Sequence, residues 1–523
     1  MKKNQSIFKA IASLAIAFGA LTSSNAQSNL GASCGCPSVS SRPEILLSSL
    51  PGYVAVSGTF GGELTTGAVL TCDNTYIIDK KIYIPAGQNI TIAPGTVLKG
   101  ATAATPAEAT ALVIERGGQI IASGTESCPI VFTAQADPMD GTYPIANQGQ
   151  WGGLVLLGRA SNNLTFAANG PYVPGAGNGR LAVADGLGVL EGFATSNIQD
   201  RFGVMQNNNN PVAGETVGTF DDNDNSGILR YVSVRHTGAF LAVGNEINGI
   251  TFGSVGRGTT VEHIEVVSCG DDNVELFGGT VNLKYVSTLF GNDDMLDWDL
   301  GWSGKCQFFF GMKSDLTSSV DSDNGIEADA DDQKSNNTPR SHPTIYNCTF
   351  VGNNKALGSA DNSGMSGIWA KELTEGEIYN SVFANFRQGM NLVKSLGTGR
   401  TYAAGGESWH NWTNIAGPAS ATNGNGSQSF KVVCNTFVGC TYPFTIGANA
   451  TGPGTQVTSG ADFTQFTVTD KNDIVTGNTL PGFDYTFTVN TTTNAFSAKN
   501  DVTPNPALSV SGCPATPVDG FFE

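Results

Sequence analysis

Charged residues are scarce in this chain, and basic residues are the scarcer kind. Asp, Glu, Lys and Arg make up 14% of the 523 residues, with 27 Lys and Arg against 45 Asp and Glu, for a formal net charge of −18. Nucleic-acid binding depends on Lys and Arg that neutralise phosphates, so this balance argues against a nucleic-acid partner. The apolar fraction of 40% is high enough for a folded core and excludes a disordered composition.

Long apolar runs are missing outside the N-terminus. Lys2 and Lys3 precede an apolar stretch at 7–21, and the small residues of 24–26 follow it. This order is typical of a secretory signal peptide, which we expect at 1–26. No other stretch approaches the ~20 apolar residues of a membrane span, so no transmembrane segment is expected. The mature protein should therefore be secreted, extracellular or on the outer cell surface.

Common catalytic and metal-binding motifs are also missing. The four histidines are scattered, and there is no H-E-x-x-H, G-x-S-x-G or phosphate-binding loop motif. The ten cysteines include no C-x-x-C pair, which argues against a zinc site. An even number of cysteines in an exported protein allows disulfides. We expect a local bridge between Cys434 and Cys440, and several other cysteines as small apolar core residues.

What the sequence does contain is a repeated strand pattern, in which an apolar residue is followed by others three and five positions later. The step from Val261 to Leu283 is 22 residues, and longer steps are expected where loops leave the turns. A period near 22 with several short strands fits one coil of a parallel solenoid. The pattern occurs at Leu229, Val232 and Val234, at Val261, Ile264 and Val266, at Leu283, Val286 and Thr288, at Ile345, Cys348 and Phe350, and at Ile378, Ser381 and Phe383.

The rest of the chain follows the same organisation. Short β-branched runs separated by Gly and Pro occur at 90–97, 112–122 and 151–157, and no amphipathic helix of useful length follows the signal peptide. The sequence therefore predicts an all-β protein, a right-handed parallel β-helix with long loop excursions. We assign 27–71 to an N-terminal extension and cap, and 72–523 to the β-helix. Segments of about 160–225 and 395–428, rich in Asn, Gly, Ala and Ser, are predicted excursions.

Three segments, at 89–100, 149–160 and 270–282, give the chain a family resemblance. It resembles the pectate-lyase-like β-helix proteins that environmental Gram-negative bacteria secrete or display on their surface. The resemblance covers roughly 34–523. It implies the β-helix fold, and by analogy of fold alone it points to polysaccharide or a cell-envelope glycan as the partner.

Acidic residues recur at equivalent positions of three successive coils. The segment 271–277 aligns with 293–299 at an offset of 22 residues, and 293–299 aligns with 323–329 at an offset of 30. Val274, Leu296 and Ile326 then form one apolar column. Strand alternation places the acidic residues on the opposite, outer face, where we expect one exposed cluster of Glu275, Asp297, Glu327, Asp299 and Asp329.

Stacked carboxylates repel one another, because equivalent residues of adjacent coils lie ~4.8 Å apart. A bound Ca²⁺ would relieve the repulsion, which makes Ca²⁺ the expected cofactor and these five residues its candidate ligands. Alternatively one carboxyl stays protonated and acts as a general acid, with Asp297 and Asp299 as the catalytic candidates. A third interpretation is a solvated acidic stripe whose Asp residues make turn hydrogen bonds.

Two further features bear on chemistry. Asp222 and Asp224 lie in Asp-Asn-Asp-Asn-Ser-Gly, which copies the start of a calcium loop but has Ser233 where an EF-hand has its bidentate Glu. A calcium-bound turn and a simple Asx turn remain equally open there. Aligning Ile368 with Ile326 places Lys371 level with Asp329, as a candidate base of a lyase or as a charge-balancing residue.

Tryptophans are the candidate sugar-stacking residues. Trp298 is predicted to point inward, whereas Trp302, Trp409 and Trp412 fall in predicted loops and are assigned to substrate binding.

Taken together, the sequence favours a secreted or surface β-helix that binds Ca²⁺ and contacts polysaccharide, in an adhesive or structural role. The alternative is a polysaccharide lyase or glycoside hydrolase acting through the same acidic face.

Overall fold

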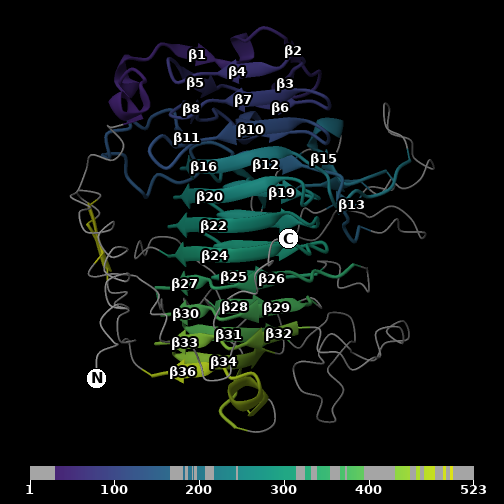
Figure 1. The fold of residues 1–523 in the computed structure, drawn as a ribbon, viewed down its shortest axis with the longest axis vertical. Coiled ribbons are helices and arrows are strands. Elements are labelled where there is room, and N and C mark those ends of the chain that lie inside the picture. Colours follow the sequence, from purple (N-terminus) through teal and green to yellow (C-terminus); the bar gives the residue numbers. More distant parts are fainter. Residues whose placement is uncertain are drawn as a thin grey trace, which may run out of the picture.

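In the computed structural model the chain winds into a long stack of short strands that runs from β1 at one end to β36 at the other (Figure 1). The only helices among the described residues are short: η2 (Ala32–Cys34), η3 (Val39–Ser41), η4 (Leu47–Ser49), η5 (Pro106–Glu108), η6 (Ile198–Asp200) and the π-helix η9 (Gln465–Thr469). The structure describes residues 30–164, 181–182, 187–190, 193, 197–205, 217–242, 245–313, 324–330, 339–353, 366–371, 374–393, 430–447, 455–459, 464–476, 487–490 and 495–498. The signal peptide predicted at 1–26 and the excursion predicted at 395–428 lie outside them.

One side of the solenoid is a 13-stranded sheet. Its strands are parallel except for the hairpin pairs β2–β3 and β34–β35, which lie at its two ends. In spatial order they are β2 (Tyr53–Ala55), β3 (Gly61–Leu64), β6 (Lys81–Ile84), β9 (Ala111–Ile114), β12 (Leu154–Leu157), β19 (Ile250–Gly253), β21 (Val274–Phe277), β23 (Leu296–Asp299), β25 (Ile326–Ala328), β28 (Ser366–Ala370), β31 (Gln388–Val393), β34 (Tyr442–Gly447) and β35 (Thr455–Gln456).

The other two sides belong to one bent, 18-stranded parallel sheet. Four long strands run around the bend: β16 (Gly227–Arg235), β20 (Thr260–Val267), β22 (Asn282–Leu289) and β24 (Lys305–Met312). Short strands before the bend are β4 (Ala68–Leu70), β7 (Asn89–Ile92), β10 (Gln119–Ser123), β26 (Thr344–Tyr346), β29 (Gly376–Tyr379) and β32 (Phe430–Val433). Those after it are β1 (Glu44–Leu46), β5 (Thr75–Ile78), β8 (Val97–Gly100), β11 (Ile130–Ala134), β27 (Thr349–Val351), β30 (Val382–Ala384), β33 (Thr436–Val438) and β36 (Asp473–Val475). The chain is thus a parallel β-helix, as the sequence predicts.

The register matches the repeat found in the sequence. Leu229 pairs with Val261, and Val261 pairs with Leu283, so the 22-residue step is one coil. Ile345 likewise pairs with Ile378 on later coils. These residues are buried in one continuous core that fills the solenoid. The predicted column of Val274, Leu296 and Ile326 lies in that core, with Leu296 paired directly with Ile326.

From β16 onward, the bend of the 18-stranded sheet is made by one residue per coil in the left-handed region, and these residues are called the bend column. The bend column is Tyr231, His263, Tyr285, Phe308, Asn347, Asn380, Cys434 and Lys471, with φ between 49° and 60°. A left-handed residue reverses the alternation of side chains, so that residues on both sides of it point into the core. This explains the three-residue spacing of the sequence pattern, because Val261 and Ile264 flank His263.

Parallel pairing begins inside the segment assigned to an N-terminal extension and cap. Strands β1, β3 and β4 pair with β5, β6 and β7 respectively. The preceding residues lie along the outside of the first coils, where Leu30 and Val39 pack against Val97 and Val131. Two disulfides, Cys34–Cys128 and Cys36–Cys72, fasten this segment to the solenoid.

The predicted bridge between Cys434 and Cys440 is wrong. Cys434 is disulfide-bonded, whereas Cys440 is a free cysteine. Cys434 occupies the bend column before β33, while Cys440 follows β33 and packs against the core, so a whole strand separates the two residues. Cys269, Cys306 and Cys348 are free and buried, as expected for small apolar core residues.

The excursion after β12 contains a small antiparallel sheet of β13 (Leu181–Ala182), β14 (Gly188–Val189) and β15 (Arg201–Phe202). Two hairpins complete the described strands: β17 (Phe240–Ala242) with β18 (Asn245–Glu246), and β37 (Phe487–Asn490) with β38 (Ala495–Ala498). Within the described residues, no helix is long and apolar enough to cross a membrane.

Candidate functional site

The acidic residues predicted to stack do occupy equivalent positions on consecutive coils. Glu275 of β21 pairs with Asp297 of β23, and Asp297 pairs with Glu327 of β25. Their strand neighbours Val274, Leu276 and Leu296 lie in the core. Alternation therefore directs Glu275 and Asp297 to the outer face of the 13-stranded sheet, as the sequence indicates.

The prediction that this outer cluster is exposed is wrong. The exposed fraction is 1% for Glu275, 3% for Asp297 and 0% for both Asp299 and Asp329, and Glu327 is only partly exposed. The outer face of the sheet is covered by a second apolar cluster. In it, Phe277 and Leu300 pack with residues of the excursion after β12, including Phe202. Side chains that point outward from the sheet are therefore still buried here, because the excursion after β12 folds back over the outer face of the sheet.

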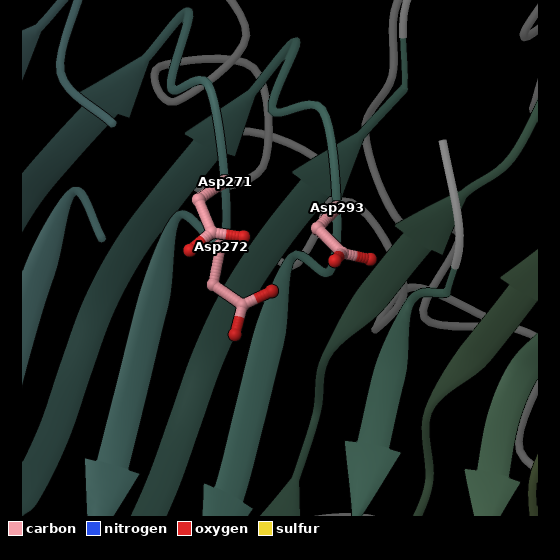
Figure 2. A group of neighbouring side chains, drawn as sticks. All are labelled: Asp271, Asp272 and Asp293. Atoms are coloured by element: carbon pink, nitrogen blue, oxygen red, sulfur yellow. The ribbon is translucent and has the colours of Figure 1, made fainter. Parts of the chain in front are cut away.

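Three-membered groups of carboxylates converge where the chain enters β21 and β23. Asp271, Asp272 and Asp293 form one group, and Asp272, Glu275 and Asp297 form another, each with oxygens within 4.8 Å of one another. Figure 2 shows Asp271 and Asp272 side by side on one coil and Asp293 on the adjacent coil. Asp272 belongs to both groups and joins them into one cluster, called here the Asp272 site.

Sequence reasoning considered turn hydrogen bonds as one interpretation of the aspartates in this segment and did not name Asp272 among the candidate ligands. The available signal was the pair of consecutive aspartates at 271–272, repeated 22 residues later at 293–294. A single turn Asp is common, but a doubled Asp at the same place on two coils adds charge that the turn does not need.

A hydrogen-bonded ladder fixes Asp272 in place. Oδ1 of Asp272 accepts a bond from the backbone N–H of Asp294 at 2.8 Å. Oδ1 of Asp294 accepts from the N–H of Asn324, and Oδ1 of Asn324 accepts from the N–H of Ser366 at 2.9 Å. Each rung needs only one side-chain oxygen, and Asn324 shows that an amide supplies it. The charges of Asp272 and Asp294 therefore exceed what the ladder requires.

Asn248 adds a neutral oxygen to the site. It lies one coil before Asp272, because Ile250 pairs with Val274, and it is 2% exposed. Its Nδ2 donates to Oε2 of Glu275, while its carbonyl oxygen Oδ1 is buried with no hydrogen-bond partner among the described residues. Ca²⁺ in proteins is bound by six to eight oxygens, among them carboxylates and Asn carbonyls, so Asn248 supplies the same type of ligand as its acidic neighbours.

The electrostatics of the site demand a counter-charge. Burial raises the pKa of Asp272 well above its usual range, and the neighbouring carboxylates of Asp297, Asp271, Asp294 and Asp293 raise it further. Two like charges at this spacing repel by about 3 kcal/mol at an effective dielectric constant near 20. A divalent cation or a proton would relieve the repulsion, and the oxygen-only donor set suits a hard cation such as Ca²⁺.

Lys371 lies where the alignment predicts, beside the acidic column. Ile368 pairs with Ile326, and Nζ of Lys371 contacts Oε1 of Glu327 at 2.7 Å and Oδ2 of Asp329 at 3.0 Å. The same ammonium lies 4.6 Å from the ring centroid of Trp369. These contacts hold the ammonium between two carboxylates and a ring, which favours the charge-balancing alternative over a base free to accept a proton.

The loop of Asp222 and Asp224 has the geometry of a structural turn. Asp222 accepts a bond from the backbone N–H of Ser161 at 3.0 Å, and its carboxylate lies 3.7 Å from Arg257. Asp224 accepts from the N–H of Arg159 at 3.2 Å. Both carboxylates thus fasten the loop to the segment that follows β12, which favours a structural role over a calcium loop. The Asx turns of this loop are made by the neighbouring Asp221 and Asn225, which accept the backbone N–H of Asn223 and of Gly227.

The assignment of Trp302 to an exposed sugar-stacking role is wrong. Trp302 is fully buried, its ring lies 5.9 Å from that of Trp298, and its Nε1 donates to the carbonyl of Val281 at 3.1 Å. The turn after Leu300 directs the indole inward, and the sequence of a tight turn resembles that of a loop. Trp298 is buried as expected. Trp409 and Trp412 lie outside the described residues.

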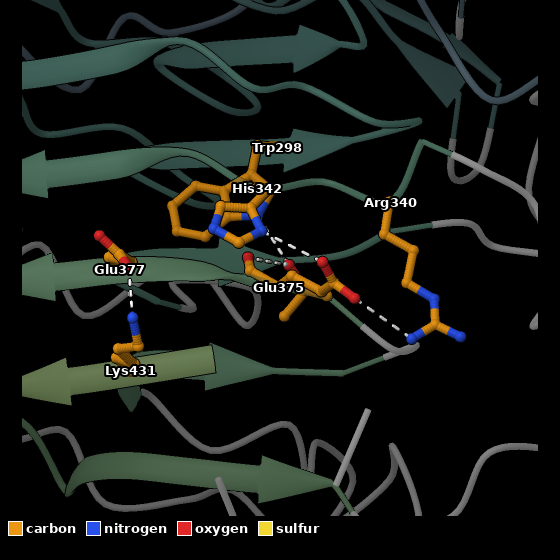
Figure 3. Close-up of polar contacts among 7 residues, drawn as sticks. Trp298, Arg340, His342, Glu375, Glu377 and Lys431 are labelled. Carbon is orange, nitrogen blue, oxygen red and sulfur yellow. Dashed lines mark hydrogen bonds and ion pairs between the residues drawn. The ribbon is translucent and has the colours of Figure 1, made fainter. Parts of the chain in front are cut away.

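A polar cluster lies near the next coils (Figure 3). The carboxylate of Glu375 contacts Nη1 of Arg340 at 3.3 Å and Nδ1 of His342 at 3.1 Å. Nearby, Nε1 of Trp298 donates to Oγ1 of Thr374 at 3.0 Å. These contacts tie the segment before β26 to the turn before β29, which is a structural role.

The fold and the covered acidic face define a class of protein, the parallel β-helix with a carboxylate site on its 13-stranded sheet. The chain belongs to the family of pectate-lyase-like β-helix domains, whose family model matches residues 62–171 and 184–413. No curated protein and no solved structure matches the chain.

Proposed function

We propose that the protein is an extracellular β-helix that binds Ca²⁺ at the Asp272 site and contacts polysaccharide, in an adhesive or structural role. The observation that carries the proposal is the position of Asp272, which is shared by two groups of converging carboxylates. The buried carbonyl oxygen of Asn248 beside Glu275 supports a cation there, because it offers a neutral ligand that no hydrogen-bond donor of the described residues uses.

The polysaccharide part of the proposal follows from the family. A pectate-lyase-like β-helix presents long parallel faces on which an extended chain can lie, and the family description itself refers to enzymes of polysaccharide breakdown. The two disulfides fit an oxidising compartment outside the cytoplasm. The half-buried carboxylates of Asp271 and Asp293 would leave a bound cation accessible from one side, where oxygens of a glycan can complete its coordination.

Cleavage of the glycan has less support than binding. A lyase needs a base that accepts a proton, but the ammonium of Lys371 is held by Glu327 and Asp329. Asp297 and Asp299, the other two catalytic candidates, are both buried, and Asp299 accepts a bond from the backbone N–H of Leu300. None of the three groups is placed for proton exchange with a surface ligand.

The cation is tested by thermal unfolding of the purified mature protein in chelator, Mg²⁺ and Ca²⁺. A ligand that binds only the native state stabilises it by about 2.7 kcal/mol at 100 times its Kd, so Ca²⁺ should raise the Tm. Asp272→Asn should abolish this rise. Asp222→Asn is the matched control, because its carboxylate lies in the structural turn, and it should keep the rise.

Polysaccharide contact is tested by affinity electrophoresis on neutral and acidic glycans, with the same gels scored for cleavage. Retardation without shortening of the glycan is the expected result. Equal melting curves in chelator and Ca²⁺ would refute the cation site, and free migration in every glycan would refute the polysaccharide contact. Release of unsaturated, ultraviolet-absorbing products would instead establish a lyase.

A further inference from the structure

Four consecutive members of the bend column are large aromatic residues that stack on one another. The ring centroids are 4.3 Å apart for Tyr231 and His263, 4.6 Å for His263 and Tyr285, and 5.1 Å for Tyr285 and Phe308. The rings are close to parallel, with interplanar angles of 11°, 21° and 6°. At these separations the rings are offset, as favourable aromatic stacks are, so part of each ring is left uncovered by its neighbour.

Backbone geometry makes this choice of residues unusual. A non-glycine residue in the left-handed region costs roughly 1–2 kcal/mol, and Asn tolerates it better than a bulky residue does. The next two coils follow that preference with Asn347 and Asn380 in the same column. Stacking on both sides offsets the cost for His263 and Tyr285. It offsets less for the two end members, Tyr231 and Phe308, and Phe308 has Asn347 at the equivalent position of the next coil.

Where the bend column changes from aromatic rings to asparagine amides, the surface offers both an apolar contact and hydrogen-bonding groups. Tyr285 is 40% exposed and Phe308 is 38% exposed, which is high for aromatic residues in a solenoid wall. Beyond Phe308, Nδ2 of Asn380 donates to Oδ1 of Asn347, and both amides are partly exposed. The other two amide atoms, Nδ2 of Asn347 and Oδ1 of Asn380, make no hydrogen bond with any of the described residues. A donor and an acceptor therefore lie beside an apolar ring.

We propose that Phe308, Asn347 and Asn380 form a binding site for a pyranose ring of the polysaccharide. The axial C–H bonds of a pyranose form an apolar face that packs on an aromatic ring, and its equatorial hydroxyls pair with a neighbouring amide donor and acceptor. The sugar ring continues the aromatic stack by one step along the solenoid axis. This inference rests on the polysaccharide contact proposed above and assigns it a place.

The pyranose site is separate from the Asp272 site. Phe308 lies at the bend of the 18-stranded sheet, whereas Asp272 precedes β21 of the 13-stranded sheet. Substitutions at the bend leave the carboxylates unchanged, so loss of glycan binding and loss of Ca²⁺ binding can be measured independently. Lys284 adds a positive charge near the rings, because its Nζ lies 5.2 Å from the centroid of Tyr285. The site therefore accommodates uronic acids as well as neutral sugars.

The test is Phe308→Asn, which removes the ring and gives this left-handed position an Asn, the residue that the next two coils have there. Tyr231→Asn is the matched control, because it removes the ring at the opposite end of the same stack. Affinity electrophoresis against the glycans that retard the wild type should show at least a tenfold loss of affinity for Phe308→Asn and less than a twofold change for Tyr231→Asn. Asn347→Ala with Asn380→Ala should weaken binding by a similar factor.

Melting curves in chelator and Ca²⁺ complete the test. The rise in Tm with Ca²⁺ should be the same in Phe308→Asn as in the wild type, which shows that the fold and the Asp272 site are intact. Equal glycan affinity of wild type and Phe308→Asn would overturn the pyranose site while the proposed polysaccharide contact stands. A wild-type protein that binds no glycan would overturn both.

Discussion

Asp272 and Asp294 occupy equivalent positions on consecutive coils, and Oδ1 of Asp272 accepts the backbone N–H of Asp294 at 2.8 Å. The bond joins two coils through a side chain, and it repeats from Asp294 to Asn324 and from Asn324 to Ser366. Because the amide of Asn324 makes the same bond as the carboxylates, the ladder separates structural hydrogen bonding from charge. Exchange of Asp and Asn within it changes the charge and keeps the shape.

The first prediction follows from this exchange. Asp294→Asn should raise the Tm of the protein in chelator, because it keeps the hydrogen bond to Asn324 and removes one of the charges that repel Asp272. The converse change, Asn324→Asp, should lower the Tm in chelator by adding a carboxylate to the column. Calorimetry of both variants in chelator measures the effect, and a change of the same sign in both would contradict it.

The second prediction concerns Lys371. Lys371→Met should destabilise the protein by roughly 3–5 kcal/mol, since it removes a positive charge 3.0 Å from the buried carboxylate of Asp329. Lys431→Met is the control: Lys431 pairs with Glu377 in a partly exposed position, also drawn in Figure 3, and its loss should cost about 1 kcal/mol or less. Urea denaturation measures both, and equal costs would contradict the prediction.

The third prediction is a pH dependence centred on His236. This side chain is 5% exposed, its Nδ1 lies 2.9 Å from the carbonyl of Asn147, and burial lowers its pKa. Asp137 and Arg235 act on it in opposite directions, Asp137 raising the pKa and Arg235 lowering it. The unfolded chain therefore takes up a proton near pH 6.5 that the folded chain takes up only at lower pH. Stability from this group is complete above about pH 6.5 and is lost as the pH falls through the folded pKa.

The measurement compares wild type with His236→Asn, which suits the left-handed backbone at this position. Urea denaturation at pH 8 and pH 5.5 should show a larger loss of unfolding free energy in the wild type than in the variant. Carboxylates titrate in both proteins, so the difference between them isolates the histidine. An identical pH dependence would show that His236 makes no contribution.

The fourth prediction tests the core register. Val274→Asp should destabilise the protein by more than about 4 kcal/mol, because it places a charge in a position that is 2% exposed. Val69→Asp, at a strand position that is 70% exposed, should change stability by about 0.5 kcal/mol or less. Circular dichroism during urea unfolding distinguishes the two outcomes, and a tolerated Val274→Asp would contradict the register.

The columns of the solenoid were predictable because they depend on local spacing. The offsets of 22 and 30 residues suffice to align Glu275 with Asp297 and Glu327, and the pairing agrees. Alternation then gives the side of the sheet on which each residue lies. Exposure was not predictable from the same data, because Phe277 and its neighbours are covered by residues from the distant excursion after β12.

Two other errors have a common physical origin. Trp302 and Cys434 both lie where the backbone turns, Cys434 with a positive φ of its own and Trp302 two residues after Leu300, whose φ is positive. A left-handed residue changes the direction of the following side chains. Cys434 and Leu300 are such residues without being glycine, so the sequence gives no warning of them, although Gly301 between Leu300 and Trp302 also has a positive φ. The same reversal is visible only where it repeats on many coils, as it does at His263 and Tyr285.

The disulfides Cys34–Cys128 and Cys36–Cys72 lie at one end of a molecule in which each coil contacts mainly its neighbours. In such a one-dimensional array, unfolding spreads from an end inward rather than through the whole body at once. The two covalent links keep the first coils together even when neighbouring coils open. Under protease, these first coils should therefore persist as a durable N-terminal remnant.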